Sequence, residues 1–155
     1  MNSNIKREMK TIKFSGKVKR VAIMFAMAIF LFPVASCAQK VNFLISTVTP
    51  AAKGTVRVKS DSNKNYRIKI HIGNLAEPSR LNPSKTAYVV WMVSGENAPK
   101  NIGQIKTSTA FLSTKLKADF ESVSVEKPNK IFITAENDPG VQYMYSEVIL
   151  TTKNF

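Results

Sequence analysis

Cysteine and histidine are almost absent from this chain of 155 residues, which contains one of each. A structural zinc site needs three or four nitrogen or sulfur ligands, and an intramolecular disulfide needs two thiols, so neither can stabilise the fold. The sequence also lacks a glycine-rich phosphate-binding loop. We therefore expect no metal, no cofactor and no internal disulfide.

Acidic residues are scarce as well, since 10 Asp and Glu stand against 23 Lys and Arg, and the formal net charge is +13. Residues 1–36 hold seven basic residues and one acidic residue, so nearly half of the excess lies there. Residues 37–155 hold 16 basic and nine acidic residues, which is a moderate balance. Because the overall charge depends so strongly on the N-terminal segment, it does not indicate a nucleic-acid-binding protein.

Long apolar runs are limited to one, at 21–32, and it is shorter than the roughly 20 residues that a transmembrane helix needs. It follows a basic stretch that ends at Arg20 and precedes small residues, which is the layout of a secretory signal. The residues VASC at 34–37 resemble the lipobox of bacterial lipoproteins. That resemblance implies cleavage before Cys37 and attachment of a lipid to its thiol. Ordinary signal cleavage after Ala38 is the alternative.

These features divide the chain into a lipoprotein signal peptide (1–36), a lipidated N-terminus with a short tether (37–40) and a folded domain (41–155). Either Met1 or Met9 could be the start, because a basic head precedes the apolar run in both cases. The expected location is the cell envelope of a Gram-negative bacterium. There the lipid would hold the protein on the periplasmic face of the outer or inner membrane, or on the cell surface.

Beyond the cysteine, short segments alternate apolar and polar residues, with the period of a half-buried strand. β-Branched residues dominate these segments, and proline and glycine fall between them. The pattern predicts an all-β, antiparallel sandwich or barrel of about seven to nine strands. The expected strands are 41–48, 56–59, 66–72, 87–94, 102–106, 110–117, 121–126, 130–136 and 146–152.

The second half of the chain carries a series of motifs in a set order. They are an aromatic-x-x-Trp strand, a hydrophobic-Gly strand, a strand ending in Thr-x-Glu, a Pro-Gly loop and a final apolar strand. In this sequence they are Tyr88 to Trp91, Ile102-Gly103, Thr134 to Glu136, Pro139-Gly140 and Glu147 to Leu150.

This series, over residues 85–152, resembles the extracytoplasmic C-terminal domain of anti-sigma-K factors. The resemblance implies an immunoglobulin-like β-sandwich outside the cytoplasmic membrane. It does not carry over sigma-factor binding, because residues 1–20 are basic and polar and contain no His or Cys for a zinc motif.

A basic face is expected on the hairpin formed by 56–59 and 66–72, which turn-forming residues connect. Such a face could bind anionic lipid head groups or acidic glycans. Alternatively, Lys on exposed and edge strands only prevents edge-to-edge pairing, and the face would then have no ligand. Nucleic acid is not expected, because few aromatic residues interleave with the basic ones. The side chains concerned are Arg57, Lys59, Arg67 and Lys69, with His71 beside them.

Two apolar features also suggest contacts. Tyr143, Met144 and Tyr145 form a candidate site for an envelope protein or glycan, although core packing would explain them almost as well. The expected strand 87–94 is apolar on both faces, so either a loop such as 76–84 or a partner must cover the face that does not join the core.

Catalysis is not expected. Imidazole-dependent catalysis needs a positioned histidine, and His71 is expected on a solvated face. Glu121 with Glu126, or Glu136 with Asp138, could hydrolyse a glycosidic bond, but nothing in the sequence fixes their spacing. We therefore expect a lipid-anchored, non-catalytic binding module of the cell envelope. The first alternative is a purely structural envelope lipoprotein, and the second is a glycan hydrolase.

Overall fold

The computed structural model describes most of the chain, namely residues 16–17, 20, 38–109 and 116–155. The chain divides into two compact units, Met1–Ala35 and Ser36–Phe155, and all of the strands belong to the second. Cys37, the predicted site of lipid attachment, lies outside the described residues, as does nearly all of the predicted signal peptide.

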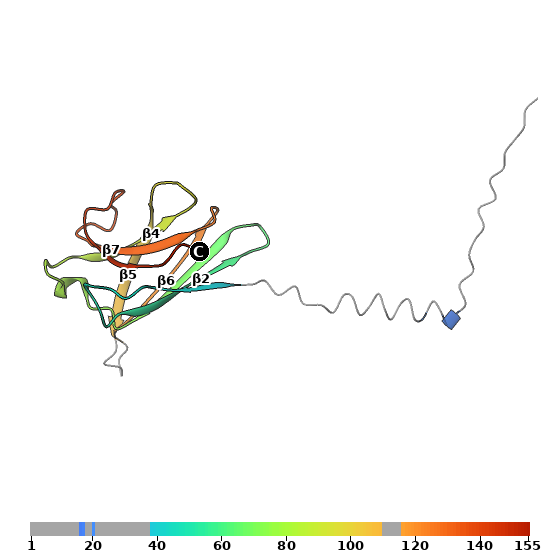
Figure 1. The fold of residues 1–155 in the computed structure, drawn as a ribbon, viewed down its shortest axis with the longest axis horizontal. Helices are drawn as coiled ribbons and strands as arrows, with labels where there is room; N and C mark the ends of the chain where they lie inside the picture. Colours follow the sequence, from blue (N-terminus) through green and yellow to red (C-terminus); the bar gives the residue numbers. More distant parts are fainter. Residues whose placement is uncertain (1–15, 18–19, 21–37, 110–115) are drawn as a thin grey trace, which may run out of the picture. The chain divides into compact units, whose positions relative to one another are not determined.

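Eight strands and a single turn of 3-10 helix form in the described residues (Figure 1). Every pair of neighbouring strands is antiparallel, and their order is β1-β2-β3-β6-β5-β4-β7-β8. The elements are β1 (Gln39–Asn42), β2 (Lys53–Ser60), β3 (Tyr66–Gly73), η1 (Pro78–Arg80), β4 (Ala87–Val93), β5 (Lys100–Thr109), β6 (Leu116–Ser124), β7 (Lys130–Glu136) and β8 (Val148–Thr151).

Two sheets pack against each other, and β5 belongs to both. Its residues 106–109 pair with β6 in the first sheet, which also contains β1, β2 and β3, whereas residues 100–105 pair with β4 in the second sheet, beside β7 and β8. Gly103 lies at the β4–β5 register shift with φ 135°, and a Cβ there would come within 2.9 Å of the Phe120 ring. Glycine therefore permits the bend by which β5 passes between sheets.

This strand order is that of an immunoglobulin-like sandwich. The order β2-β3-β6-β5 matches strands A-B-E-D of that fold, and β4, β7 and β8 match C, F and G. Trp91 is buried on β4, but on the face of that strand turned away from the main core. An isolated bridge between Phe43 and Thr152 also connects the segment after β1 with the segment after β8. The predicted all-β, antiparallel sandwich is confirmed.

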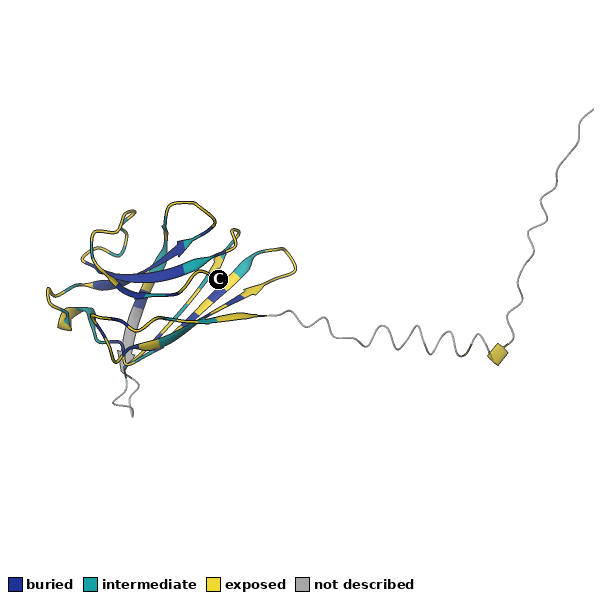
Figure 2. Ribbon diagram, viewed as in Figure 1, coloured by how far each residue is buried: buried dark blue, intermediate teal, exposed yellow. Residues whose placement is uncertain are grey.

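The main core lies between the two sheets and is built from alternate residues of the strands (Figure 2). In β3, Ile68, Ile70 and Ile72 are buried and the residues between them are exposed, as the period of two predicts. Tyr88 and Met92 of β4 contribute from the second sheet. Each such side chain stabilises the fold by about 1.5–3 kcal/mol on burial, and this burial holds the two sheets together.

The expected strand 41–48 is wrong in its bounds, because β1 covers only Gln39–Asn42. The Oγ atom of Ser46 accepts hydrogen bonds from the backbone N–H groups of Val48 (3.2 Å) and Thr49 (2.9 Å). A side chain that accepts local backbone hydrogen bonds in this way favours a turn over an extended strand. The first strand also begins two residues earlier than predicted, so only Ala38 separates it from Cys37.

The break expected between the strands 110–117 and 121–126 is wrong. A single strand, β6, runs from Leu116 to Ser124, and residues 110–115 lie outside the described part of the chain. Charged side chains at 117, 119 and 121 alternate with Ala118 and the half-buried Phe120, which is the period of one continuous strand. The interruption expected between 117 and 121 does not exist.

The second face of β4 is covered within the chain, but not by the loop that the sequence suggested. Val89, Trp91 and Phe132 form a separate buried cluster on that face, and Val141 packs against it. The covering segment is thus the loop between β7 and β8. The loop 76–84 instead closes the main core, where Leu81 packs and where Tyr88 donates a hydrogen bond to the Ala76 carbonyl (2.9 Å).

Candidate functional site

The predicted hairpin forms, and its register places the expected basic residues on one surface. Arg57 lies opposite Lys69, and Lys59 lies opposite Arg67, in the antiparallel pair of β2 and β3. Side chains directly opposite each other in such a pair project from the same face. All four are exposed, whereas Val58, between the two basic residues of β2, and Ile68, between those of β3, are buried.

The neighbouring strands β1 and β6 extend this surface, which we call the basic face. Lys40 of β1 lies opposite Arg57, and Lys117 of β6 lies opposite Gly73, with Lys53 on the other side of that glycine. The basic face therefore presents seven exposed Lys and Arg and two exposed carboxylates on β1, β2, β3 and β6. Its basic members are Lys40, Lys53, Arg57, Lys59, Arg67, Lys69 and Lys117, and its acidic members are Asp119 and Glu121.

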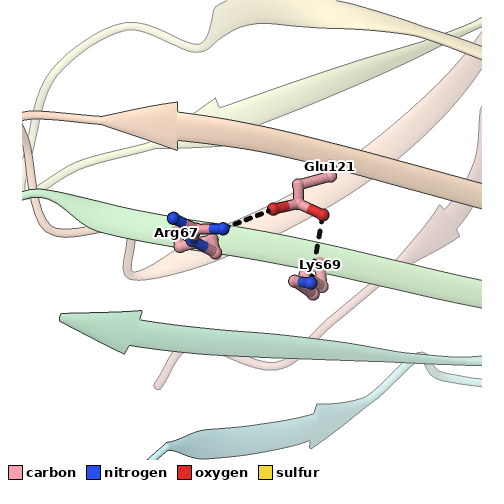
Figure 3. A network of polar contacts seen from close by, with 3 residues as sticks. All are labelled: Arg67, Lys69 and Glu121. Atoms are coloured by element: carbon pink, nitrogen blue, oxygen red, sulfur yellow. Dashed lines mark hydrogen bonds and ion pairs between the residues drawn. The ribbon is translucent and has the colours of Figure 1, made fainter. Parts of the chain in front are cut away.

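Glu121 of β6 is shared between two cations of β3 on the basic face (Figure 3). Arg67 Nη1 donates to Glu121 Oε1 and Lys69 Nζ donates to Glu121 Oε2, each at 3.1 Å. The hydrogen bond from Lys69 is the main reason why the pKa of Glu121 is lowered, and Arg67 adds to it. One carboxylate cannot neutralise two cations, so this cluster keeps a positive charge.

His71 lies on the same face and faces a carboxylate that the sequence reasoning missed. Its Nδ1 is 2.6 Å from Oδ1 of Asp119, which lies directly opposite on β6. Both side chains are largely exposed, as predicted for His71. The alternation of charged residues at 117, 119 and 121 was a signal that could have located Asp119 on this face.

A hollow of about 540 Å³ lies over the basic face. Thr55 and Arg57 line it from β2, and Lys69 and His71 line it from β3. The carboxylates of β6 form the remaining polar wall, with Ile70 and Phe120 also contributing. The hollow could hold an anionic group between Arg57 and Lys69, because Arg57 has no acidic partner among the described residues.

The second predicted contact site, Tyr143 to Tyr145, lies in the loop between β7 and β8, outside the core. Tyr143 is 73% exposed and Tyr145 is 78% exposed, so core packing does not explain them. The end of this loop is held by Glu136, which is 2% exposed and accepts a hydrogen bond from the Ser146 hydroxyl at 2.9 Å. Lys85 in turn donates to Ser146 Oγ at 2.9 Å. The exposed aromatic residues therefore adjoin a fixed polar network.

The predicted carboxylate pairs have separate contacts. Glu121 of β6 is engaged by Arg67 and Lys69 of β3, whereas Glu126 lies beyond the end of β6 and its backbone N–H donates to Ser124 Oγ at 3.0 Å. Glu136 Oε2 accepts a hydrogen bond from the Ser146 hydroxyl, and Asp138 Oδ1 accepts one from the backbone N–H of Gly140 at 2.8 Å. Each of these contacts orders the fold locally.

Comparisons with known proteins add no assignment, since no protein-family model, curated protein or solved structure matches the chain. Within the described ranges, no helix is long and apolar enough to cross a membrane. The same residues contain no group of three or more His, Cys, Asp or Glu side chains arranged to hold a metal ion.

Proposed function

We propose that the chain is an exported, lipid-anchored β-sandwich of the cell envelope that binds an anionic partner through the basic face, without catalysis. The observation that carries this proposal is the place of the basic residues in the sheet. Arg57 and Lys59 belong to β2, Arg67 and Lys69 belong to β3, and both strands have neighbours on each side. Protection of a sheet edge therefore does not account for them, because β1 is the edge strand.

The partner's chemistry follows from the charges. Exposed ion pairs stabilise a fold by only about 0–1 kcal/mol, so a surplus of five cations on one face contributes little to the domain itself. Gathered on one surface, these cations instead raise the local potential and attract phosphate, sulfate or carboxylate groups. The partner class is thus a polyanion with repeated charges rather than a small neutral ligand.

Binding to an immobilised polyanion tests this role. The double charge reversal Arg57→Glu/Lys59→Glu should elute from heparin at a clearly lower salt concentration than the wild-type chain. The matched control is Lys100→Glu/Lys153→Glu, which changes the net charge equally at exposed residues outside the basic face. Equal losses in both variants would show that only net charge matters, and would favour the purely structural lipoprotein.

The lipid anchor is tested separately by mass spectrometry of the mature N-terminus. The expected product begins at Cys37 and carries the mass of a diacylglycerol, with further acylation of its amino group. Labelled palmitate should enter the wild-type chain and be absent from Cys37→Ala. A mature chain that begins at Gln39 without lipid would contradict the anchor and support ordinary signal cleavage.

A second binding surface is favoured by one observation, the exposure of Tyr143 and Tyr145 beside an anchored loop end. Aromatic residues held in place are typical contact points for a protein partner. Capture of the same envelope protein by the wild type and loss of it with Tyr143→Ala/Tyr145→Ala would support this surface. Unchanged capture would remove it.

A further inference from the structure

We infer that the anionic partner of the basic face is the phospholipid surface of the same bilayer that holds the N-terminal lipid. The sandwich would then lie with its first sheet against the head groups. This inference rests on the proposed function, and it specifies the partner that the proposed function leaves as a polyanion. Two features of the described residues lead to it, the spread of charge and one exposed valine, together with the short length of chain between Cys37 and β1.

The tether leaves the domain little freedom to leave the membrane. Strand β1 begins at Gln39, two residues after Cys37, and an extended chain spans at most about 3.6 Å per residue, or roughly 7 Å here. That length is within a Debye length, about 8–10 Å at physiological ionic strength. Lys40, on this first strand, belongs to the basic face. The lipid therefore brings the edge of the basic face within electrostatic reach of the head groups.

The charge is spread over the sheet rather than gathered in the hollow. Arg57 and Lys69 line the hollow, whereas the other five basic side chains of the face lie outside it. A small acidic ligand would need only the cations that line the hollow. A membrane presents anionic groups over the whole area of the basic face. Juxtamembrane clusters of Lys and Arg are the usual means of binding such a surface.

An exposed apolar side chain completes the match. Val123 on β6 lies opposite Arg67, on the basic face, and is 58% exposed. Next to cations, an apolar side chain can enter the boundary between head groups and acyl chains. The acyl chains of the proposed anchor already hold the chain on a bilayer, so the basic face would set the orientation of the domain on that bilayer.

This orientation separates the two surfaces of the protein. The loop between β7 and β8 begins over the outer face of the second sheet, where Val141 packs against the Trp91 cluster. The basic face is the outer face of the first sheet, on the other side of the core. With the basic face on the head groups, this covering loop points away from the bilayer that holds the chain.

The test is lysine footprinting of the lipidated mature protein on vesicles. The protein is reconstituted on phosphatidylcholine vesicles, or on vesicles of phosphatidylcholine and phosphatidylglycerol in equal parts. An amine-acetylating reagent then modifies lysines, and peptide mass spectrometry gives the rate at each one. Lys40, Lys59 and Lys69 should react about fivefold more slowly on the anionic vesicles. The attraction of one basic residue to a charged surface shifts its binding equilibrium by about that factor. Lys100 and Lys153 serve as internal controls and should react equally on both.

A variant and a competitor decide between the outcomes. Arg57→Glu/Lys59→Glu should stay on the anionic vesicles through its lipid, yet lose the protection of Lys40 and Lys69. Equal rates on both vesicles for the wild type would overturn membrane docking while leaving polyanion binding intact. Protection by soluble heparin on neutral vesicles, without protection by phosphatidylglycerol, would assign the face to an acidic glycan. A mature chain without lipid would contradict the anchor and the docking together, whereas heparin retention would still report on the face.

Discussion

The two outer faces of the sandwich differ in their exposure to solvent. The outer face of the first sheet carries charged side chains and is open, whereas the outer face of the second carries Val89, Trp91 and Phe132 and is buried. Strict alternation in β3 is sufficient for the first case. The second case requires a loop of the same chain as a third layer.

The covering loop is held by specific contacts. Asn101 Nδ2 donates to the carbonyl oxygens of Pro139 (2.9 Å) and Val141 (2.8 Å). Under the loop, the Trp91 and Phe132 rings stack with centroids 6.1 Å apart, and Trp91 Nε1 donates to Thr134 Oγ1 at 2.9 Å. The difference between the faces shows that an apolar outer face needs an apolar residue that covers it, here Val141. It also needs hydrogen bonds that hold the backbone of the covering loop in place.

The largest expected effect comes from removing the centre of the covered face. Trp91→Ala should destabilise the domain by about 3–5 kcal/mol, because it leaves a large cavity beneath the loop and removes the partner of Thr134. Urea unfolding followed by circular dichroism measures the loss. Tyr143→Ala, in the same loop but exposed, is the control and should change stability by no more than about 0.5 kcal/mol. Similar losses in both variants would contradict the division into covered and open surfaces.

An intermediate effect is expected from releasing the covering loop. Asn101→Ala should cost about 1–3 kcal/mol, since two carbonyl oxygens lose their donor and the Gly103 N–H loses the Asn101 Oδ1 acceptor. Hydrogen exchange should increase at residues 139–142 while the amides of β3 stay protected. Asn101→Asp separates the effect of the lost donors from that of the lost acceptor, because it retains an acceptor for the Gly103 N–H and lacks the two N–H donors. Faster exchange throughout both sheets would mean that the loop is not a separate layer.

The smallest effect is expected on the open face. Glu121→Gln should change stability only slightly at neutral pH, because its ion pairs are exposed. Folding lowers the pKa of Glu121, so its contribution is present above the unfolded-state pKa and is lost as the pH falls through the folded-state value. Unfolding measured from neutral to acid pH should therefore show a small wild-type advantage that disappears in acid. The variant should also elute from heparin at higher salt, because the face loses a negative charge.

Glu126→Gln is the control for this comparison, since Glu126 is exposed and lies beyond the end of β6. It should show no comparable gain in heparin affinity. An equal gain in both variants would indicate that the face does not act as a local surface.

The open face could be predicted largely from sequence, because the alternation of apolar and polar residues indicates directly which side chains are exposed. Arg57, Lys59, Arg67 and Lys69 were placed correctly by parity, and β7 was predicted with the bounds that it has. Lys40 and Asp119 were missed because their strands were given wrong bounds, and a strand must be recognised before its parity can be used.

The covered face could be predicted only in part. The apolar character of β4 on both sides indicated that something must cover it, but not which loop. That choice depends on Asn101 reaching carbonyl oxygens about 40 residues away in sequence, and backbone acceptors have no side-chain signature. The buried role of Glu136 was hidden as well, because its partner is the backbone N–H and hydroxyl of Ser146, in the loop that follows β7.

The bridge between Phe43 and Thr152 has a consequence for when this fold can form. Leu44 N–H donates to the Thr151 carbonyl at 2.8 Å. Residues just after β1 therefore contact residues at the end of β8, although more than 100 positions of sequence separate them. Contacts of such long sequence separation form slowly, and this one forms only after residue 152 has been synthesised. The sandwich is thus closed only once the strands from β1 to β8 and the residues up to Thr152 have all been synthesised.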